Sequence, residues 1–306
     1  MTSAAMVRQE TATAILTKAD PALPALKVTG AHEIAIRAGT VFAGRAFTDD
    51  TIIARPEGGW AVGADYVVVV VGTDAPMAVK LVTAPVGDVH LGGFHVAPGG
   101  NASARGGGDD QPAINPFSCW DLNFRPSCAD PRGMTLVELA GGRKFWCDIY
   151  LLGTKHLSDG TSKFGAVIAD GNECPQRVDG DGNYRRFDYD TARAVMTHHG
   201  KGLLSLEEFF AAAFGVTEKS TCDDEPERSA LDAARTSKWG VIQATGNMWV
   251  WGHDGDPDLP RASLFGGSWL SDGGAGSRCA HVAYYWPDAS HDSLGARGRG
   301  DHLQLG

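Results

Sequence analysis

The sequence predicts a small all-β module followed by an α+β domain. Short runs of β-branched and apolar residues, each bounded by turn-forming residues, fill positions 25–97 and are typical of strands. Two short helices with clear capping residues are predicted later, between positions 188 and 215, and stretches rich in Gly and Trp follow them. Two short helices followed by strands rich in Trp and Gly favour an α+β domain.

Five apolar runs predict the first module. Turn sequences, such as Pro-Glu-Gly-Gly at positions 56–59, separate these runs. The expected strands are residues 26–29, 33–36, 51–54, 66–71 and 78–82. We therefore assign residues 25–97 to an all-β stem or oligomerisation module, and residues 1–24 to an N-terminal arm.

A stretch of small and polar residues follows this module. Positions 98–112 are rich in Gly, Ser, Asn and Asp, as in a flexible connection. We therefore place the domain boundary there and assign residues 113–306 to the second domain.

The first predicted helix begins near Asp188 or Asp190, either of which can cap it, and ends at Gly200. The residues that recur at helical spacing along it are Ala192, Val195, Met196 and His199.

The second predicted helix carries a stronger start signal. Ser205 and Glu208 have the spacing of a capping box, while Leu204 and Phe209 occupy the positions of a hydrophobic staple. Gly215 is placed to end the helix.

Charge and composition exclude several partners. The net charge is −10 and the pI is about 5.4, so no basic stripe is available for nucleic acid. The longest apolar run, residues 66–71, is far shorter than the ~20 residues that span a bilayer, so no membrane insertion is expected. The N-terminus carries no Sec export signal. An extracellular role would therefore depend on another route, such as release on cell lysis.

The usual catalytic motifs are missing. Neither Gly-x-Ser-x-Gly nor His-Glu-x-x-His occurs, and the six cysteines include no Cys-x-x-Cys pair. The cysteines are therefore expected to be reduced thiols. His198 and His199, at a predicted helix end, are interpreted as partners of the helix dipole in preference to metal ligands. Trp249 and Trp251 would share one strand face and are assigned to the core.

Two acidic loops allow two interpretations. Residues 179–183 resemble the first half of a calcium loop, but Tyr184 stands where Gly is needed and Asp190 where a bidentate Glu is usual. Residues 254–258 form a second loop of this kind. Solvated turns are favoured, structural calcium remains the alternative, and no other cofactor is expected.

The segment from Cys279 to Leu294 predicts a binding surface. It has neither helical nor strand periodicity, yet it is rich in His, Tyr, Trp, Asp and Ser. Tyr and Trp give large contact areas at low entropic cost, and the smaller polar residues give adaptable hydrogen bonds, as in a paratope.

The order of motifs in the second domain resembles the formylglycine-generating-enzyme branch of the C-type lectin fold. The motifs are residues 200–209, 246–251, 266–269 and 295–298. Within that branch the chain is similar to the variable proteins of diversity-generating retroelements, which include phage receptor-binding proteins of the major-tropism-determinant type. The residues that carry this similarity are 120–126, 130–134, 231–240 and 298–303. It covers about the last two-thirds of the chain.

The resemblance implies a set of diversified ligand-binding positions near the C-terminus. By position these are Ser271, Asp272, Gly273, His281, Ala283, Tyr284, Tyr285, Asp288, Ser290, His291 and Ser293. Each belongs to the residue types reached by randomising the adenines of an Asn codon. Trp286 does not belong to that set, so it is interpreted as a fixed or flanking contact.

The chain departs from the pattern of the enzymes in this branch. Their redox cysteine pair is missing, because residues 269–277 contain no cysteine and Cys279 stands alone. Val250 replaces the acidic residue that is common between the two tryptophans, which weakens a calcium site there. Gly300 stands where family members often have Cys, so the local packing is expected to differ.

The resemblance therefore implies a non-enzymatic phage adhesin. Such a protein would be made in the host cytoplasm, released on lysis and carried at the tail-fibre tip of the virion. It would be a homotrimer that binds a bacterial surface protein or glycan and attaches to other tail-fibre proteins through its β module. Two alternatives remain: an oxidoreductase of the formylglycine-generating or sulfoxide-synthase type, and a cellular diversified binding protein outside any phage.

Overall fold

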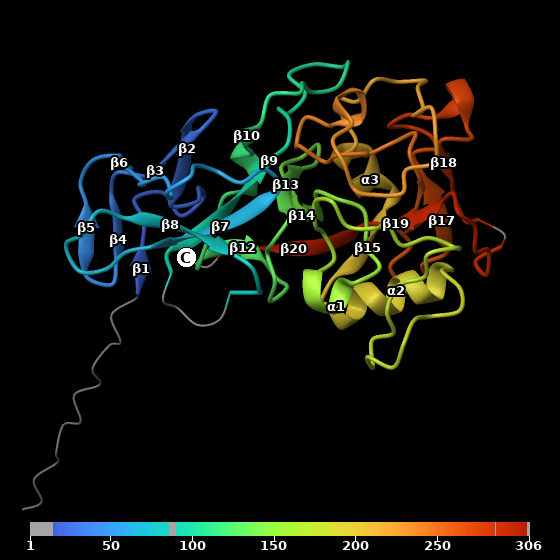
Figure 1. Cartoon of the computed structure of the whole chain (residues 1–306), viewed down its shortest axis with the longest axis horizontal. Helices are drawn as coiled ribbons and strands as arrows, with labels where there is room; N and C mark the ends of the chain where they lie inside the picture. The colour runs from blue at the N-terminus through green and yellow to red at the C-terminus, as the bar shows by residue number, and fades with distance from the viewer. Residues whose placement is uncertain (1–14, 86–89, 285, 305–306) are drawn as a thin grey trace, which may run out of the picture.

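The computed structural model of this chain describes residues 15–85, 90–284 and 286–304 (Figure 1). Tyr285, one of the expected ligand-binding residues, and positions 1–14 of the expected N-terminal arm lie outside these ranges. Two three-stranded sheets form one end of the molecule, whereas β17 and β18 lie at the other end (Figure 1).

The two small sheets contain the first six strands. One sheet has the order β1-β4-β5 and the other β2-β3-β6. Their bounds are β1 (Leu16–Thr17), β2 (Leu26–Gly30), β3 (Glu33–Ile36), β4 (Thr40–Phe42), β5 (Arg45–Phe47) and β6 (Thr51–Ile52). Buried apolar residues of these strands, such as Leu26, Ile34 and Phe42, share one core with Tyr66 and Phe94 of the neighbouring sheet.

A 14-stranded sheet runs through the rest of the molecule. Its strands are β7 (Ala64–Val69), β8 (Met77–Leu81), β9 (Gly92–Ala97), β10 (Ala113–Ile114), β11 (Trp120–Asp121), β12 (Phe124–Pro126), β13 (Met134–Glu138), β14 (Lys144–Asp148), β15 (Gly202–Ser205), β16 (Trp249–His253), β17 (Ala262–Phe265), β18 (Ala280–His281), β19 (Leu294–Ala296) and β20 (Gly298–Gln304). The main path has the order β18-β17-β16-β15-β20-β12-β11-β9-β7-β8. Strands from the expected first module therefore pair with strands from the expected second domain.

The segment expected to connect two domains has contacts of its own. The backbone N–H of Ala102 donates to the Ser237 carbonyl at 3.1 Å, and Gly107 donates to Gly215 at 2.9 Å. The Ala102 side chain is buried. These contacts hold part of residues 98–112 against the C-terminal part of the chain.

The described part of the chain forms three short α-helices beside the large sheet, α1 (His156–Asp159), α2 (Tyr189–His198) and α3 (Leu206–Ala212). Asp188, one of the two expected caps, accepts a hydrogen bond from the Thr191 N–H at the start of α2. The capping box predicted for Ser205 and Glu208 is formed at the start of α3. None of the helices within the described ranges is both long and apolar enough to cross a membrane.

Candidate functional site

The expected ligand-binding residues that the structure describes fall into three groups near β16, β17 and β18. The first group is the turn of Ser271, Asp272 and Gly273, of which the last two are exposed and belong to the 3-10 helix η3 (Asp272–Gly274). Ser271 Oγ accepts a hydrogen bond from the Ser268 N–H at 2.9 Å. Ser271 is therefore anchored to the Gly-rich turn before it, whereas the Asp272 side chain faces solvent.

The second group follows strand β18. His281 pairs with Leu264 of β17, and its side chain is exposed. The next turn is held by two backbone hydrogen bonds: the Ala283 N–H donates to Ser263 Oγ at 3.0 Å, and the Tyr284 N–H donates to the Ala262 carbonyl at 2.5 Å. These bonds fix the direction in which Tyr284 leaves the sheet.

Aromatic rings form a continuous row through this second group. The Trp251 ring is fully buried and lies 6.1 Å from that of Tyr284, which in turn lies 6.1 Å from His281 and 5.9 Å from Trp286. Trp286 is 60% exposed at the outer end of the row. Offset and edge-to-face contacts between such rings are favourable. The row therefore connects the buried core with an accessible aromatic surface.

The third group covers positions 288–293 and is fastened to the segment before α2. The Phe187 N–H donates to Ser290 Oγ at 2.9 Å, and the Arg186 guanidinium donates to the Asp288 carbonyl. His291 accepts through its carbonyl from the Gly171 N–H at 3.0 Å, so its exposed side chain remains directed away from this bond. The Ser290 hydroxyl and the carbonyls of Asp288 and His291 thus hold the loop, and Asp288 and His291 present accessible side chains.

Trp249 connects the second and third groups. Its ring lies 4.7 Å from that of His281, and its backbone N–H donates to the Ser293 carbonyl at 2.9 Å. Trp251 is in the core as expected, whereas Trp249 is only partly buried at the edge of the same cluster. No hydrogen bond, ion pair or ring contact among the described residues joins Ser271, Asp272 or Gly273 to the other two groups.

A buried cation supports the strands beneath these groups. The Arg297 side chain is 1% exposed and donates to the carbonyls of Asp148, Ile149, Ile242 and Gln243 at 2.6–3.2 Å. Burial lowers the pKa of this guanidinium below its usual range. Arg297 thereby joins the end of β14, the segment before β16, and the connection between β19 and β20.

A second buried charge lies close to Arg297. Lys201 Nζ pairs with Asp148 Oδ1 at 2.6 Å and donates to Thr161 Oγ1, while Asp148 Oδ2 accepts from the Gly298 N–H. The buried charges of Arg297, Lys201 and Asp148 beneath the candidate surface therefore all have polar partners.

Carboxylates gather beside the third group. Burial raises the pKa of Asp170 above its usual range, and the nearby charge of Asp292 adds to this effect. The pKa of Glu225 is also raised by burial, with further contributions from Asp292 and Asp170. Three carboxyl groups, those of Asp170, Glu225 and Asp292, therefore lie close enough to influence one another at this edge of the candidate surface.

The sequence did not indicate Trp249 or Arg186 as parts of this region, and Asp292 falls in the expected segment from Cys279 to Leu294 without being among the expected ligand-binding residues. The alternation of Trp249 and Trp251 correctly indicated a shared strand face, but alternation does not show which of two residues lies at the edge of the core. Arg186 lies about 100 positions before its partner Asp288, and no local pattern signals such a pairing.

The features weighed for metal binding have protein partners. Asp179 pairs with Arg177 at 2.5 Å, and this arginine lowers the pKa of Asp179 to about 2. Asp254 pairs with Arg261 at 2.7 Å. His199 Nε2 lies 2.9 Å from His156 Nδ1. The described residues contain no cluster of three or more His, Cys, Asp or Glu arranged to hold a metal ion, and all six cysteines are free.

Comparisons with known proteins match nearly the whole chain. Residues 24–121 match the family model of the Mtd second domain. The chain is 40% identical over 330 residues to the tail fiber receptor-binding protein of Bordetella phage BPP-1, covering 94% of this chain and 84% of that protein. Among solved structures, the U1 and P3c variants of the Major Tropism Determinant each superpose with a TM-score of 0.85 at 39% identity, covering 95% of this chain and 86% of theirs.

Proposed function

The chain belongs to the family of phage tail-fibre receptor-binding proteins that includes the major tropism determinants, and from this premise we propose that its C-terminal surface binds a receptor on a bacterial cell. The fold is mostly β-sheet and of the C-type lectin-like kind found in that family. We assign it further to the formylglycine-generating-enzyme branch, on the order of its Gly-rich and Trp-rich motifs.

The aromatic row from Trp251 to Trp286 is the observation that carries the proposed binding site. A row of large rings that is buried at one end and accessible at the other provides contact area without a large loss of side-chain entropy on binding. Here Trp251 is buried, Tyr284 is half-buried and Trp286 is exposed. The polar side chains of His281, Asp288 and His291 surround this row and supply adaptable hydrogen bonds.

We propose that all three groups contribute to one diversified surface. Backbone hydrogen bonds hold the loops around Ala283 and His291, so a change of side chain there leaves the main-chain anchors in place. At these two positions the arrangement separates the scaffold from the contact side chains, whereas Ser271 and Ser290 also anchor their loops through their hydroxyl groups. It suits a protein whose displayed residues are exchanged by a retroelement.

The β module at the start of the chain is assigned to assembly. We propose residues 25–97 as a stem or oligomerisation module and residues 113–306 as the variable domain. Met77 and Val79 on β8, and Val82 just after it, are exposed apolar residues on the last strand of the main sheet path. An apolar outer strand favours contact with another chain. This supports a homotrimer attached to other fibre proteins.

Multivalency has a consequence for affinity. A single patch of this kind buries at most ~800 Å² on each partner, so one contact alone is weak. Three copies on one fibre raise the effective affinity when they engage the same cell surface. We propose the tip of the virion tail fibre as the place of this display, reached after synthesis in the host cytoplasm and release on lysis.

Enzymatic activity is not part of the proposal. Cys279 is a free thiol whose pKa is raised by burial, which disfavours the reactive thiolate. A paired redox cysteine is missing from residues 269–277. We expect no turnover in a thiol- or metal-dependent oxidation assay with the purified chain.

Adsorption of phage particles to host bacteria tests the binding site directly. Particles that carry His281→Ala together with Trp286→Ala are expected to adsorb at least ~10-fold more slowly, because two exposed contacts are lost at the centre of the surface. Leu157→Ala is the matched control, since Leu157 is also exposed but lies on α1. Normal adsorption by the double variant, with normal folding, would remove the aromatic row from the site.

A further inference from the structure

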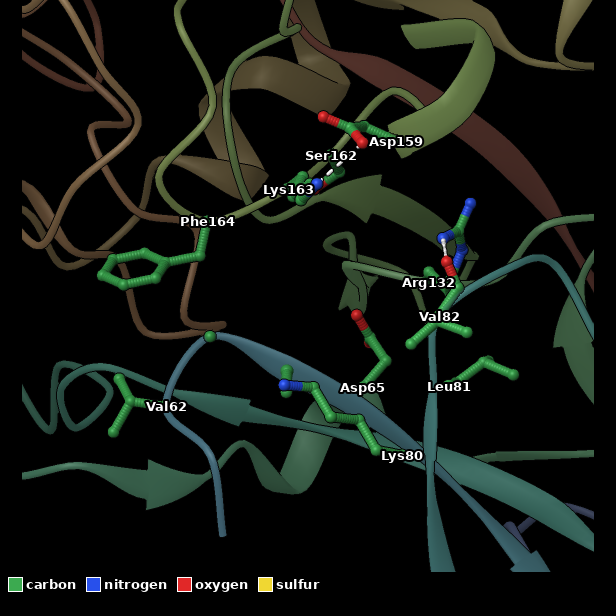
Figure 2. Close-up of a pocket in the computed structure, with 12 residues that line it drawn as sticks. Val62, Asp65, Lys80, Leu81, Val82, Arg132, Asp159, Ser162, Lys163 and Phe164 are labelled. Carbon is green, nitrogen blue, oxygen red and sulfur yellow. Dashed lines mark hydrogen bonds and ion pairs between the residues drawn. The ribbon is translucent and has the colours of Figure 1, made fainter. Parts of the chain in front are cut away.

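A cavity lies between strands β7 and β8 and the loop of residues 159–164, apart from the aromatic row. Its volume is about 350 Å³, within the range of roughly 300–1,000 Å³ that is usual for small-molecule sites. Figure 2 shows Asp65 and Lys80 rising from the sheet toward the loop that carries Phe164. Apolar side chains, among them Val62 and Leu81, form part of the wall.

Most of the charges around this cavity are neutralised within the protein. Arg132 pairs with Asp130 at 2.6 Å, and Lys163 pairs with Asp159 at 2.7 Å. Lys80 is the exception, because it forms no ion pair with another residue drawn around the cavity (Figure 2). Asp65 pairs with His95 on the inner side of the cavity, through Oδ1 alone, and its charge also acts on Arg132. A lysine without an ion-pair partner and a carboxylate with one oxygen free of hydrogen bonds therefore line the same space.

The Asp65 carboxylate is held rigidly on its inner side. Its Oδ1 atom accepts from the Gly133 N–H at 3.0 Å and lies 3.1 Å from His95 Nδ1. His95 Nε2 is in turn 2.9 Å from the hydroxyl of Tyr150, which is fully buried. Burial raises the Tyr150 pKa well above 10, so the hydroxyl stays protonated and can donate to His95. These bonds all use Oδ1, and no described donor bonds to Oδ2.

We propose that this cavity binds a small zwitterion, with its ammonium group at Asp65 Oδ2 and its carboxylate at Lys80 Nζ. Charge-assisted hydrogen bonds to a partly enclosed, preorganised carboxylate are stronger than those between neutral groups. The methylene groups between the two ends of the ligand contact Leu81 and Phe164. Such a ligand would brace the junction between the β7–β8 hairpin and the loop before Phe164.

Titration calorimetry and thermal melting with defined probes test this site. The probes are γ-aminobutyrate and ε-aminocaproate, and the single-charge controls are hexylamine and caproate. We expect saturable binding and a raised Tm with at least one zwitterion, and binding at least ~10-fold weaker with either single-charge control.

Substitutions at Lys80 and Asp65 test the two charged contacts proposed for the ligand. Lys80→Ala removes the cation, while Asp65→Asn keeps the acceptor for Gly133 and His95 but removes the charge. Each is expected to weaken zwitterion binding by about tenfold or more. Lys155→Ala removes an exposed lysine outside the cavity and is expected to bind as the parent does. Equal binding of caproate and ε-aminocaproate, unchanged affinity of Lys80→Ala, or the lack of saturable binding by any probe would overturn the proposal.

Discussion

The ring of Trp249 lies 4.7 Å from the ring of His281, where strand β16 emerges from the core beneath the candidate surface. The backbone of the same tryptophan bonds to Ser293. One half-buried residue therefore supports two of the three groups of expected ligand-binding residues, although it belongs to neither.

Trp249 and His281 are expected to differ in their effects on stability. Trp249→Ala leaves a gap at the edge of the core and should lower the free energy of unfolding by about 2 kcal/mol, less than the ~3–5 kcal/mol of a fully buried Trp. His281→Ala should change it by less than ~0.5 kcal/mol, because the side chain is exposed. Urea denaturation measures both. Equal decreases in the free energy of unfolding for Trp249→Ala and His281→Ala would show that Trp249 does not support the surface.

Two neighbouring candidate positions should differ in their tolerance to change. Ser290 Oγ accepts from the Phe187 N–H, so Ser290→Ala leaves that donor without its partner and should cost about 1 kcal/mol. His291 contacts Gly171 only through its backbone, so His291→Ala should be neutral within ~0.5 kcal/mol. Thermal melts of the two variants test this ranking. A larger loss of stability in His291→Ala than in Ser290→Ala would contradict this ranking.

Arg297 is expected to be essential for folding. Arg297→Met keeps much of the side-chain length but removes the guanidinium donor from four buried carbonyls, of which that of Ile149 keeps a bond from the Ile242 N–H. Each carbonyl left without a donor costs ~1–3 kcal/mol. Arg297→Lys retains a charge with fewer donors and should be intermediate. The yield of soluble protein and its urea midpoint measure the effect. A Met variant as stable as the parent would show that water replaces the guanidinium.

Acid should destabilise the chain through the histidine pair near α1 and α2. Burial, together with the neighbouring charges of His156, Lys201 and His198, lowers the pKa of His199 from 6.5 to about 4. The pKa of His156 is lowered as well, mainly by burial. Between about pH 4 and pH 6.5, His199 is protonated in more of the unfolded chains than of the folded chains. The free energy of unfolding therefore falls as the pH decreases through this window.

The pH prediction has a matched control. His199→Gln should flatten the dependence of Tm on pH in that window, whereas His32→Gln should leave it unchanged because the His32 side chain is exposed. Asp130 faces the same histidine and partly opposes the shift. An unchanged slope in His199→Gln would assign the acid sensitivity to other groups.

Local signals predicted much of the secondary structure. Asp188 and the Ser205–Glu208 capping box start α2 and α3 as expected, because a cap depends on residues within one turn. The five strands expected in residues 26–82 have counterparts in β2, β3, β6, β7 and β8. The strands β4 and β5 were missed because each has only three residues, too short to show a period.

The candidate site was predicted in part. Composition indicated a displayed segment from Cys279 to Leu294, and the structure places His281, Trp286, Asp288 and His291 at exposed positions there. Tyr284 is only half exposed, because its ring packs toward Trp251. That the three groups act as one binding surface remains a prediction for the adsorption experiment.

By itself the sequence determined the local structure and the family, since capping, alternation and motif order all depend on residues that are close along the chain or in a fixed order. Only the tertiary structure decided that β9 joins β11 and that β12 joins β20, which makes one sheet of segments expected in two domains. It also decided the cavity between Asp65 and Lys80 and the position of Arg297 among four carbonyls. These features depend on residues up to 180 positions apart, as in the pairing of Phe124 with Gln304, and their contacts arise from packing in three dimensions and have no period in the sequence.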